Sequence, residues 1–91
     1  MQDYPSQSDV EIALAKLLRR QGRLCRPAEL HGPLAEEFNL SPELRHRPRP
    51  DTSERLWNNH VQFARRRLVD QGIMTREPRG WWGLTEWKKN A

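Results

Sequence analysis

Apolar residues recur at helical spacing near the start of the chain, after a polar segment, residues 1–7, that we expect to be disordered. The apolar side chains that share one helix face here are Val10, Leu14, Leu17 and Leu18. Ser8 and Glu11 have the spacing of a capping box, in which the serine oxygen accepts a backbone N–H and the glutamate reaches back. Gly22 follows two arginines and is a usual helix stop. The pattern predicts a helix over residues 9–21.

A second apolar face follows a short extended segment, residues 23–26. Pro27 suits the first turn of a helix, because an N–H there would have no helical partner. The apolar residues that then recur at steps of four are Leu30, Leu34 and Phe38. Gly32-Pro33 interrupts this pattern, so the helix either kinks there or begins near Pro33.

The next segment carries a helix start and then helix breakers. Ser41-Pro42-Glu43 has the sequence of a cap and a first turn, and it predicts one short helix. Residues 45–50 contain two prolines, which lack an N–H and restrict the residues before them. This segment is therefore predicted to be an extended loop, and Arg45, Arg47 and Arg49 make it basic.

The longest periodic segment follows that loop. Ser53 can cap a helix that runs to about Gln71, with Gly72 as its stop. The apolar stripe of this helix consists of Trp57, Val61, Ala64 and Leu68, with Leu56 and Phe63 on its flank. The period predicts one long amphipathic helix with a separate polar face.

Alternation replaces the helical period in the last quarter of the chain. The predicted strands are 73–76 and 81–84, joined by a basic turn at 78–80. Side chains alternate across a strand, so Trp82 and Leu84 are expected in the core and Trp81 outside. Thr85 is expected to cap a last helical turn.

This order of elements is typical of the winged helix, a helix-turn-helix variant in which the hairpin is the wing. The sequence therefore predicts a fold that is mainly α with a small β-hairpin. The winged-helix domain is expected over residues 8–87. Residues 88–91 are expected to be a tail that links this domain to one absent from the chain.

Charge is distributed unevenly along the 91 residues, whose formal net charge is +4. Residues 1–44 hold five basic and seven acidic side chains, a net of −2, whereas residues 45–91 hold eleven basic and five acidic ones, a net of +6. The basic surface therefore belongs to the second half, and a basic surface suits an anionic partner.

The sequence also bears on the compartment. A lone cysteine, Cys25, cannot form an internal disulfide, which fits a reducing environment. No apolar run approaches the length of a membrane span, and the first residues lack the character of a signal peptide. We expect a cytoplasmic protein of a prokaryotic cell, with no membrane partner.

The polar face of the long predicted helix carries the candidate chemistry. Its outward side chains are Arg55, Asn58, Asn59, Gln62, Arg65 and Arg66. Carboxamides can bind the N6 and N7 edge of adenine, and arginine can bind guanine O6 and N7. Such a face on an arbitrary helix is more often only solvated, but the order of elements and the basic loop favour contact with double-stranded DNA.

Further contacts are expected on both sides of that helix. The residues expected at phosphates, at the helix N-terminus or at the adjacent minor groove are Arg47, Arg49, Ser53, Arg65, Arg66, Arg76 and Arg79. Trp81 is expected to pack against a sugar, a base or a partner protein, or to form only a cross-strand pair in the hairpin.

Neither a nuclease site nor a structural metal site is supported by the sequence. Pro50-Asp51 and Glu86-Trp87-Lys88 superficially match a metal-dependent nuclease, but that chemistry needs two carboxylates and a lysine converging on Mg²⁺. The histidines and Cys25 lack paired metal-ligand spacing. We therefore expect a binding module with no catalytic residues, no metal and no cofactor.

A set of motifs is found in residues 57–65, 68–73 and 79–86 and in the helix start at residues 27–30. On these motifs, most of the chain resembles the N-terminal domain of Mrr-type restriction endonucleases. In that family an Asn, an aromatic-Ala-Arg triplet and an Arg-Gly-x-Trp-x-Leu-Thr hairpin recur in this order. Phe63 stands in the triplet where Trp is commoner.

The resemblance implies a winged helix fused to a separate nuclease domain. It further implies target recognition of double-stranded DNA for a modification-dependent restriction endonuclease, with N6-methyladenine as the modification. A reader of that base needs a carboxamide and an apolar surface for the methyl group, and Trp57 or Trp81 could offer that surface. The alternatives are a winged-helix transcriptional regulator and a protein-interaction winged helix that uses Trp81 and Trp87.

Overall fold

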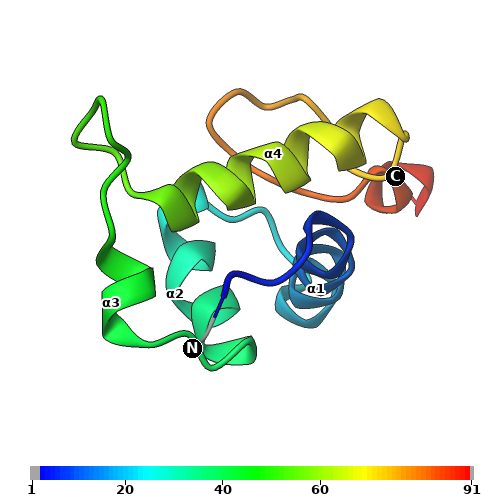
Figure 1. Cartoon of the computed structure of the whole chain (residues 1–91). Helices are drawn as coiled ribbons and strands as arrows, with labels where there is room; N and C mark the ends of the chain where they lie inside the picture. The colour runs from blue at the N-terminus through cyan, green and yellow to red at the C-terminus, as the bar shows by residue number, and fades with distance from the viewer. Residues whose placement is uncertain (1–2, 91) are drawn as a thin grey trace.

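A computed structural model describes residues 3–90 of the chain, without the side chains of residues 88–90. Within these residues it contains α1 (Gln7–Gln21), α2 (Pro27–Glu37), α3 (Pro42–His46), α4 (Leu56–Asp70) and the 3₁₀ helix η1 (Thr85–Asn90). Figure 1 shows α4 crossing one side of the molecule, with α1 and α2 beneath it and α3 near its N-terminal end. Among the described residues, no helix is both long and apolar enough to cross a membrane.

The apolar stripes that the sequence predicts form the core. Every member of the α4 stripe is buried, and so are the four residues predicted for the first helix. Cys25, Met74, Trp82 and Leu84 complete this core from outside the long helices. Trp57 is the largest fully buried side chain, and its indole Nε1 donates to the backbone carbonyl of His31 at 2.8 Å. Its polar atom is therefore satisfied inside the core.

The N-terminal segment contacts the core through Tyr4. Tyr4 packs beside the rings of Trp57 and His60, at centroid distances of 6.3 and 4.8 Å. Its hydroxyl donates to the carbonyl of Leu44 at 2.8 Å. An aromatic contact and a hydrogen bond thus connect Tyr4 to the core, whereas residues 1–2 lie outside the described part, and the expected disorder stays a prediction.

The capping box predicted at Ser8 is also wrong. Helix α1 begins at Gln7, and its N-cap is Ser6, whose hydroxyl oxygen accepts from the backbone N–H of Asp9 at 3.1 Å. Ser8 lies inside the first turn. The helix ends as predicted, because Gly22 takes the left-handed conformation with φ +66°.

Helix α2 begins at Pro27 and continues through Gly32-Pro33. Gly32 has no Cβ to meet the proline ring, so the residue before Pro33 can stay helical. Burial of Leu30 and Leu34 outweighs the hydrogen bond that Pro33 cannot make. Of the two alternatives, the start at Pro27 is confirmed and a start near Pro33 is wrong.

The segment between α2 and α4 departs from its prediction at both ends. Helix α3, capped by Ser41 as predicted, includes Arg45 and His46, which the sequence placed in the extended loop. Pro48 restricts only the residue directly before it, so these two residues remain free to be helical. Helix α4 begins at Leu56 with Arg55 as its N-cap, so Ser53 does not cap it.

A paired loop explains the later start of α4. The N–H of Arg49 donates to the carbonyl of Glu54 at 2.8 Å, and the N–H of Leu56 donates to the carbonyl of Arg47 at 2.9 Å. These bonds close the chain on itself before the helix begins. Figure 1 shows the resulting loop projecting from the body of the molecule ahead of α4.

The predicted hairpin is barely present. Among the described residues its pairing is a single antiparallel bridge, Met74 with Leu84. Two backbone hydrogen bonds flank it, from the N–H of Thr75 to the carbonyl of Gly83 at 3.1 Å and from the N–H of Thr85 to the carbonyl of Ile73 at 2.9 Å. Pro78 has no N–H to donate and Gly80 has φ +84°, so the chain between the two segments turns instead of extending. The fold is mainly helical as predicted, with almost no strand.

The short extended segment after α1 joins this remnant. Cys25 and Trp82 exchange two backbone hydrogen bonds of 3.0 and 2.8 Å. The alternation predicted for the second strand is confirmed, since Trp82 and Leu84 are buried and Trp81 is only partly so. Thr85 starts η1, so the last helical turn is confirmed as well.

Gly83→Ala should destabilise the fold. A Cβ at Gly83 would lie 2.5 Å from Cδ2 of Leu24 and 3.0 Å from the ring of Trp87, so one of these groups must move. Overpacking of this kind costs about 1–3 kcal/mol in the free energy of unfolding, measurable by urea titration. Leu24→Ala should recover part of that cost in the double variant, and strictly additive losses would contradict this packing.

Candidate nucleic-acid interface

The outward face of α4 forms the wall of a surface hollow. Side chains three and four residues apart share a helix face, so burial of the apolar stripe turns the polar residues to solvent. The hollow has a volume of about 390 Å³. It is lined by His31, Glu54, Asn58, Asn59, Gln62, Phe63, Arg65 and Arg66. The structure therefore brings together five of the six candidate residues that the sequence places on this helix face.

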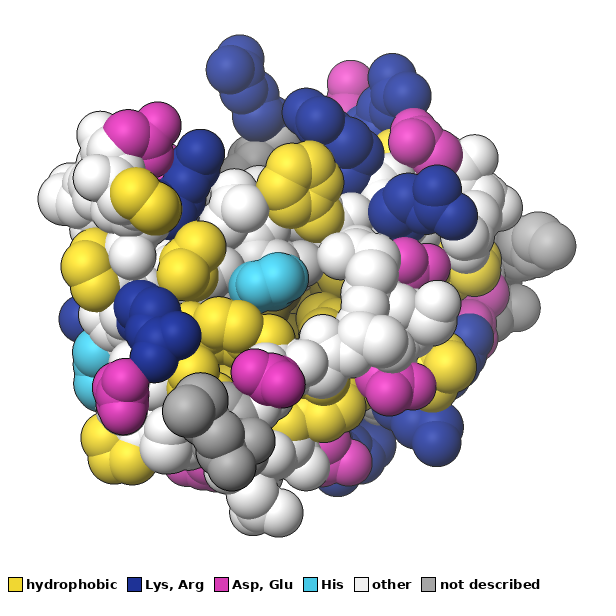
Figure 2. Space-filling view, in the orientation of Figure 1, with side chains coloured by type: hydrophobic (Ala, Val, Ile, Leu, Met, Phe, Trp, Pro, Cys, Tyr) yellow, Lys and Arg dark blue, Asp and Glu magenta, His cyan; other side chains and the backbone are white. Residues whose placement is uncertain are grey.

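A second hollow, of about 400 Å³, lies between the C-terminal half of α4 and the residues that follow it. Arg65 and Arg66 line it together with Arg76 and Arg79. Because the same two α4 arginines line both hollows, the carboxamides and the hairpin arginines belong to one continuous surface. Figure 2 shows arginine and lysine side chains gathered along the upper edge of that view, the edge that contains α4.

The arginines differ in whether a carboxylate neutralises them. Among the described residues, seven arginines have no ion pair, and five of them lie at α4 and the hairpin: Arg55, Arg65, Arg66, Arg76 and Arg79. Arg47, in contrast, lies 2.6 Å from Glu43, and Arg49 lies 3.2 Å from Glu54. The positive charge that an anion would meet is thus concentrated on α4 and the hairpin, and the loop arginines are already paired.

Arg65 has an environment of its own within this surface. Its Nε atom is buried and has no hydrogen-bond partner among the described residues. Its guanidinium carbon lies 5.7 Å from the centroid of the Trp82 ring, within the range of a cation–π contact. The ring places this guanidinium at the junction of the two hollows.

The three candidate tryptophans are less available than the sequence suggests. Trp57 is 2% exposed, so it cannot offer a surface to a methyl group. Trp81 is partly buried, and the guanidinium carbon of Arg26 lies 4.3 Å from its ring centroid. Trp87 packs against the core beside Gly83. The tryptophan surface that a protein-interaction module would need is therefore largely covered.

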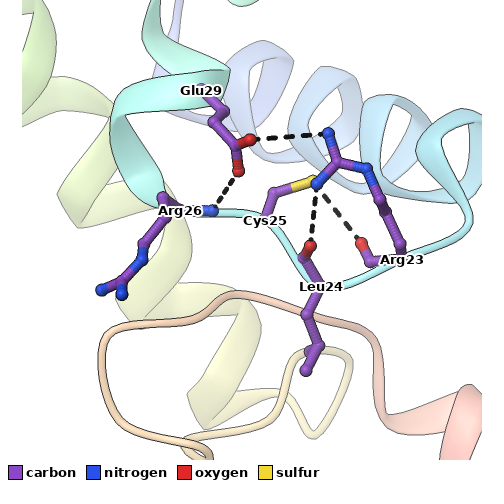
Figure 3. Close-up of polar contacts among 5 residues, drawn as sticks. All are labelled: Arg23, Leu24, Cys25, Arg26 and Glu29. Atoms are coloured by element: carbon purple, nitrogen blue, oxygen red, sulfur yellow. Dashed lines mark hydrogen bonds and ion pairs between the residues drawn. The ribbon is translucent and has the colours of Figure 1, made fainter.

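Arg26 is a basic residue of this region that sequence reasoning missed. Figure 3 shows its side chain pointing away from Glu29, whose carboxylate accepts from the Arg26 backbone N–H at 2.6 Å instead. Glu29 also pairs with Arg23 at 3.5 Å, and these contacts keep the pKa of its carboxyl below the usual value, the backbone bond most strongly. Arg26 lies in the acidic half of the sequence, so its place beside the hairpin is visible only in the folded structure, where Cys25 forms a bridge with Trp82.

His31 and Phe63 are two further residues of the first hollow that the sequence did not assign to the interface. Burial lowers the pKa of the His31 imidazole, and the charge of Arg55 lowers it further. Its Nε2 is buried and has no hydrogen-bond partner among the described residues. Phe63, predicted on the flank of the apolar stripe, is 48% exposed.

The nuclease-like pattern that the sequence sets aside is not assembled by this fold. Asp51 lies in the projecting loop before α4, where Arg49 is 4.0 Å away. Glu86 lies in η1 and pairs with Arg19 at 3.2 Å. Figure 1 places this loop and η1 at opposite ends of α4, so the two carboxylates cannot share a metal ion.

A family model described as the Mrr N-terminal domain matches residues 12–91. The chain belongs to this family. The match confirms the resemblance that the motifs indicate and relates this Mrr N-terminal domain to restriction systems that act on DNA. No curated protein and no solved structure matches the chain. In this Mrr N-terminal domain, Phe63, Arg65 and Arg79 of these motifs line the two hollows, and the buried motif residues belong to the core.

The Mrr N-terminal domain should lose stability as the pH falls below 6.5, the usual pKa of histidine. Burial lowers the pKa of both His31 and His60 in the folded state, so the unfolded state binds more protons in this range and is favoured by acid. NMR titration should place both midpoints below 6.5. The decline in unfolding free energy should be smaller in His31→Gln, and an unchanged decline would contradict burial of this ring.

Proposed function

We propose that this chain binds double-stranded DNA as a winged-helix domain, with α4 as the recognition helix in the major groove. The observation that carries the proposal is the composition of one surface: three carboxamides and a set of arginines that no described carboxylate neutralises. Unpaired arginine on a solvent-exposed helix gains most from an anion of regular spacing, and the DNA backbone is such an anion.

The interface residues have two roles, because some would face the bases of the duplex and others its phosphate backbone. Asn58, Asn59 and Gln62 lie on the outward face of α4, and their carboxamides have the donor and acceptor that the adenine edge requires. The arginines lie at the margins of this face and on the hairpin, where a duplex in contact with α4 presents phosphates. They would position the protein, while the carboxamides read the bases.

The bridges around Trp82 support a reduced wing. Residues 81–84 pair on one side with Cys25 and on the other with Met74, so three extended segments lie side by side despite the near absence of regular strand. The bridge to Cys25 and the contact between Arg26 and Trp81 would hold the tip of the wing, with Arg79, in a fixed position against α4. A wing of this kind is suited to the backbone next to the recognition groove.

Family membership supports the biological setting. We propose that the domain recognises targets for a modification-dependent restriction endonuclease whose nuclease domain is fused to it, and that the modification is N6-methyladenine. The carboxamides suit an adenine edge, and kinship with Mrr-type proteins supplies the remainder of this proposal.

Arg66→Ala should weaken binding to every duplex and make binding less sensitive to salt. Removing one phosphate contact should lower the slope of log affinity against log salt by about 0.9. Arg20→Ala makes the same change of charge on α1, where Glu37 lies 3.8 Å away, and should leave the slope unchanged. Equal effects of the two variants, measured by fluorescence anisotropy, would show that only net charge matters and contradict this interface.

Asn58→Ala, Asn59→Ala and Gln62→Ala should alter sequence preference more than overall affinity. Losing a bidentate contact to adenine costs about 1–3 kcal/mol of discrimination against the wrong base. Binding of each variant to one duplex library, prepared unmodified, adenine-methylated and cytosine-methylated, measures this preference. Unchanged preference in all three variants would refute direct readout by α4, and equal affinity of the wild type for all three libraries would refute reading of a modification.

A further inference from the structure

Phe63 is an apolar side chain on an otherwise polar surface. Among the described residues, the large exposed hydrophobic side chains are Ile12, Leu24 and Phe63, and Phe63, 48% exposed, is the one that α4 carries. A single exposed hydrophobic residue is ordinary on a protein surface. Phe63, however, lines the same hollow as the carboxamides, and this position indicates a role in binding.

The helix geometry places Phe63 directly beside a carboxamide and an arginine. Asn59 lies four residues before it and Arg66 three residues after it, so both are its neighbours on the helix surface. A base edge held by Asn59, with its phosphate near Arg66, would therefore face the Phe63 ring. The other aromatic candidates do not compete, because Trp57 is buried and Arg26 covers Trp81.

The apolar groups that base edges present in the major groove are methyl groups. Thymine carries one on C5. Methylation of adenine replaces the N6 hydrogen that points into the groove, while the other N6 hydrogen stays in the base pair. A carboxamide then loses the hydrogen that its oxygen would accept and keeps only the bond that its N–H donates to N7. An apolar surface beside the carboxamide would compensate for that loss.

We propose that Phe63 is the specificity-determining residue that contacts a major-groove methyl group, on or next to the base whose edge Asn59 binds. This inference rests on the proposed function and assigns it a residue. The methyl group can belong to thymine, to N6-methyladenine or to 5-methylcytosine, because all three present the same apolar chemistry.

The test measures the affinity of four proteins for the best duplex from the library above. The duplex carries adenine or N6-methyladenine, thymine or deoxyuridine, and cytosine or 5-methylcytosine at each position of the site in turn. The proteins are the wild type, Phe63→Ala, Phe63→Leu and Ile12→Ala. Ile12, which is 56% exposed, is an apolar control of similar exposure on α1. Circular dichroism confirms that each variant is folded.

Removing a contacted thymine or 5-methylcytosine methyl should weaken wild-type binding about fourfold, the effect of one buried methyl or methylene group, and Phe63→Ala should bind the two forms equally. Removing the N6 methyl of adenine also restores a carboxamide hydrogen bond, so there Phe63→Ala should favour the unmethylated form about fourfold more than the wild type does. At the contacted base, Phe63→Leu should keep most of the wild-type response and Ile12→Ala all of it. The base at which the difference appears identifies the source of the methyl group.

Two results would overturn the proposal. In one, Phe63→Ala retains the full difference between the methylated and unmethylated forms. In the other, neither the wild type nor Phe63→Ala shows a methyl-dependent difference at any position while salt-dependent binding persists; this refutes the role of Phe63 and leaves the proposed DNA-binding function in place. Absence of salt-dependent binding to every duplex would refute both.

Discussion

Burial of the Trp57 ring is the interaction on which the rest of the fold depends. The ring lies 6.1 Å from Phe38 in an edge-on arrangement and beside Tyr4, and its N–H donates to the carbonyl of His31. One side chain of α4 thus joins the N-terminal segment and α2 to the long helix. A large aromatic ring removes much apolar area from water, which a chain of this size needs. Its burial also settles which face of α4 remains outside.

The outward face of α4 is positively charged because few carboxylates pair with its arginines. Carboxylates of η1, α3 and the loop before α4 pair with Arg19, Arg47 and Arg49. Arg66 and Arg79 have no such partner among the described residues, so the net charge of the second half becomes a localised positive surface. Local pairing therefore selects, from many basic residues, those that an anionic ligand would meet.

The structure places the aromatic side chains differently from what their sequence positions suggest. Trp57 and Trp82 are structural, Trp81 carries the guanidinium of Arg26, and Phe63 is the ring that reaches solvent beside the carboxamides. The hairpin has almost no regular ladder of its own, and backbone hydrogen bonds between Cys25 and Trp82 attach it to the segment after α1. Under the proposed function, recognition of DNA by this chain would then depend on α4 and its immediate neighbours more than on a long wing.

The sequence by itself determined that the helices exist, the apolar stripe of α4 and its polar face, because hydrophobic periodicity is a local property of the chain. Its family motifs predicted the Mrr relationship that the match over residues 12–91 confirmed. Tertiary structure alone decided that Ser6 and not Ser8 caps α1, that Arg26 lies on Trp81 and that Arg47 is paired. These outcomes depend on which residues distant in sequence, or competing nearby, reach the same point in space. Exposure of Phe63 belongs to this second group, since a flank position becomes core or surface only when the neighbouring elements are placed.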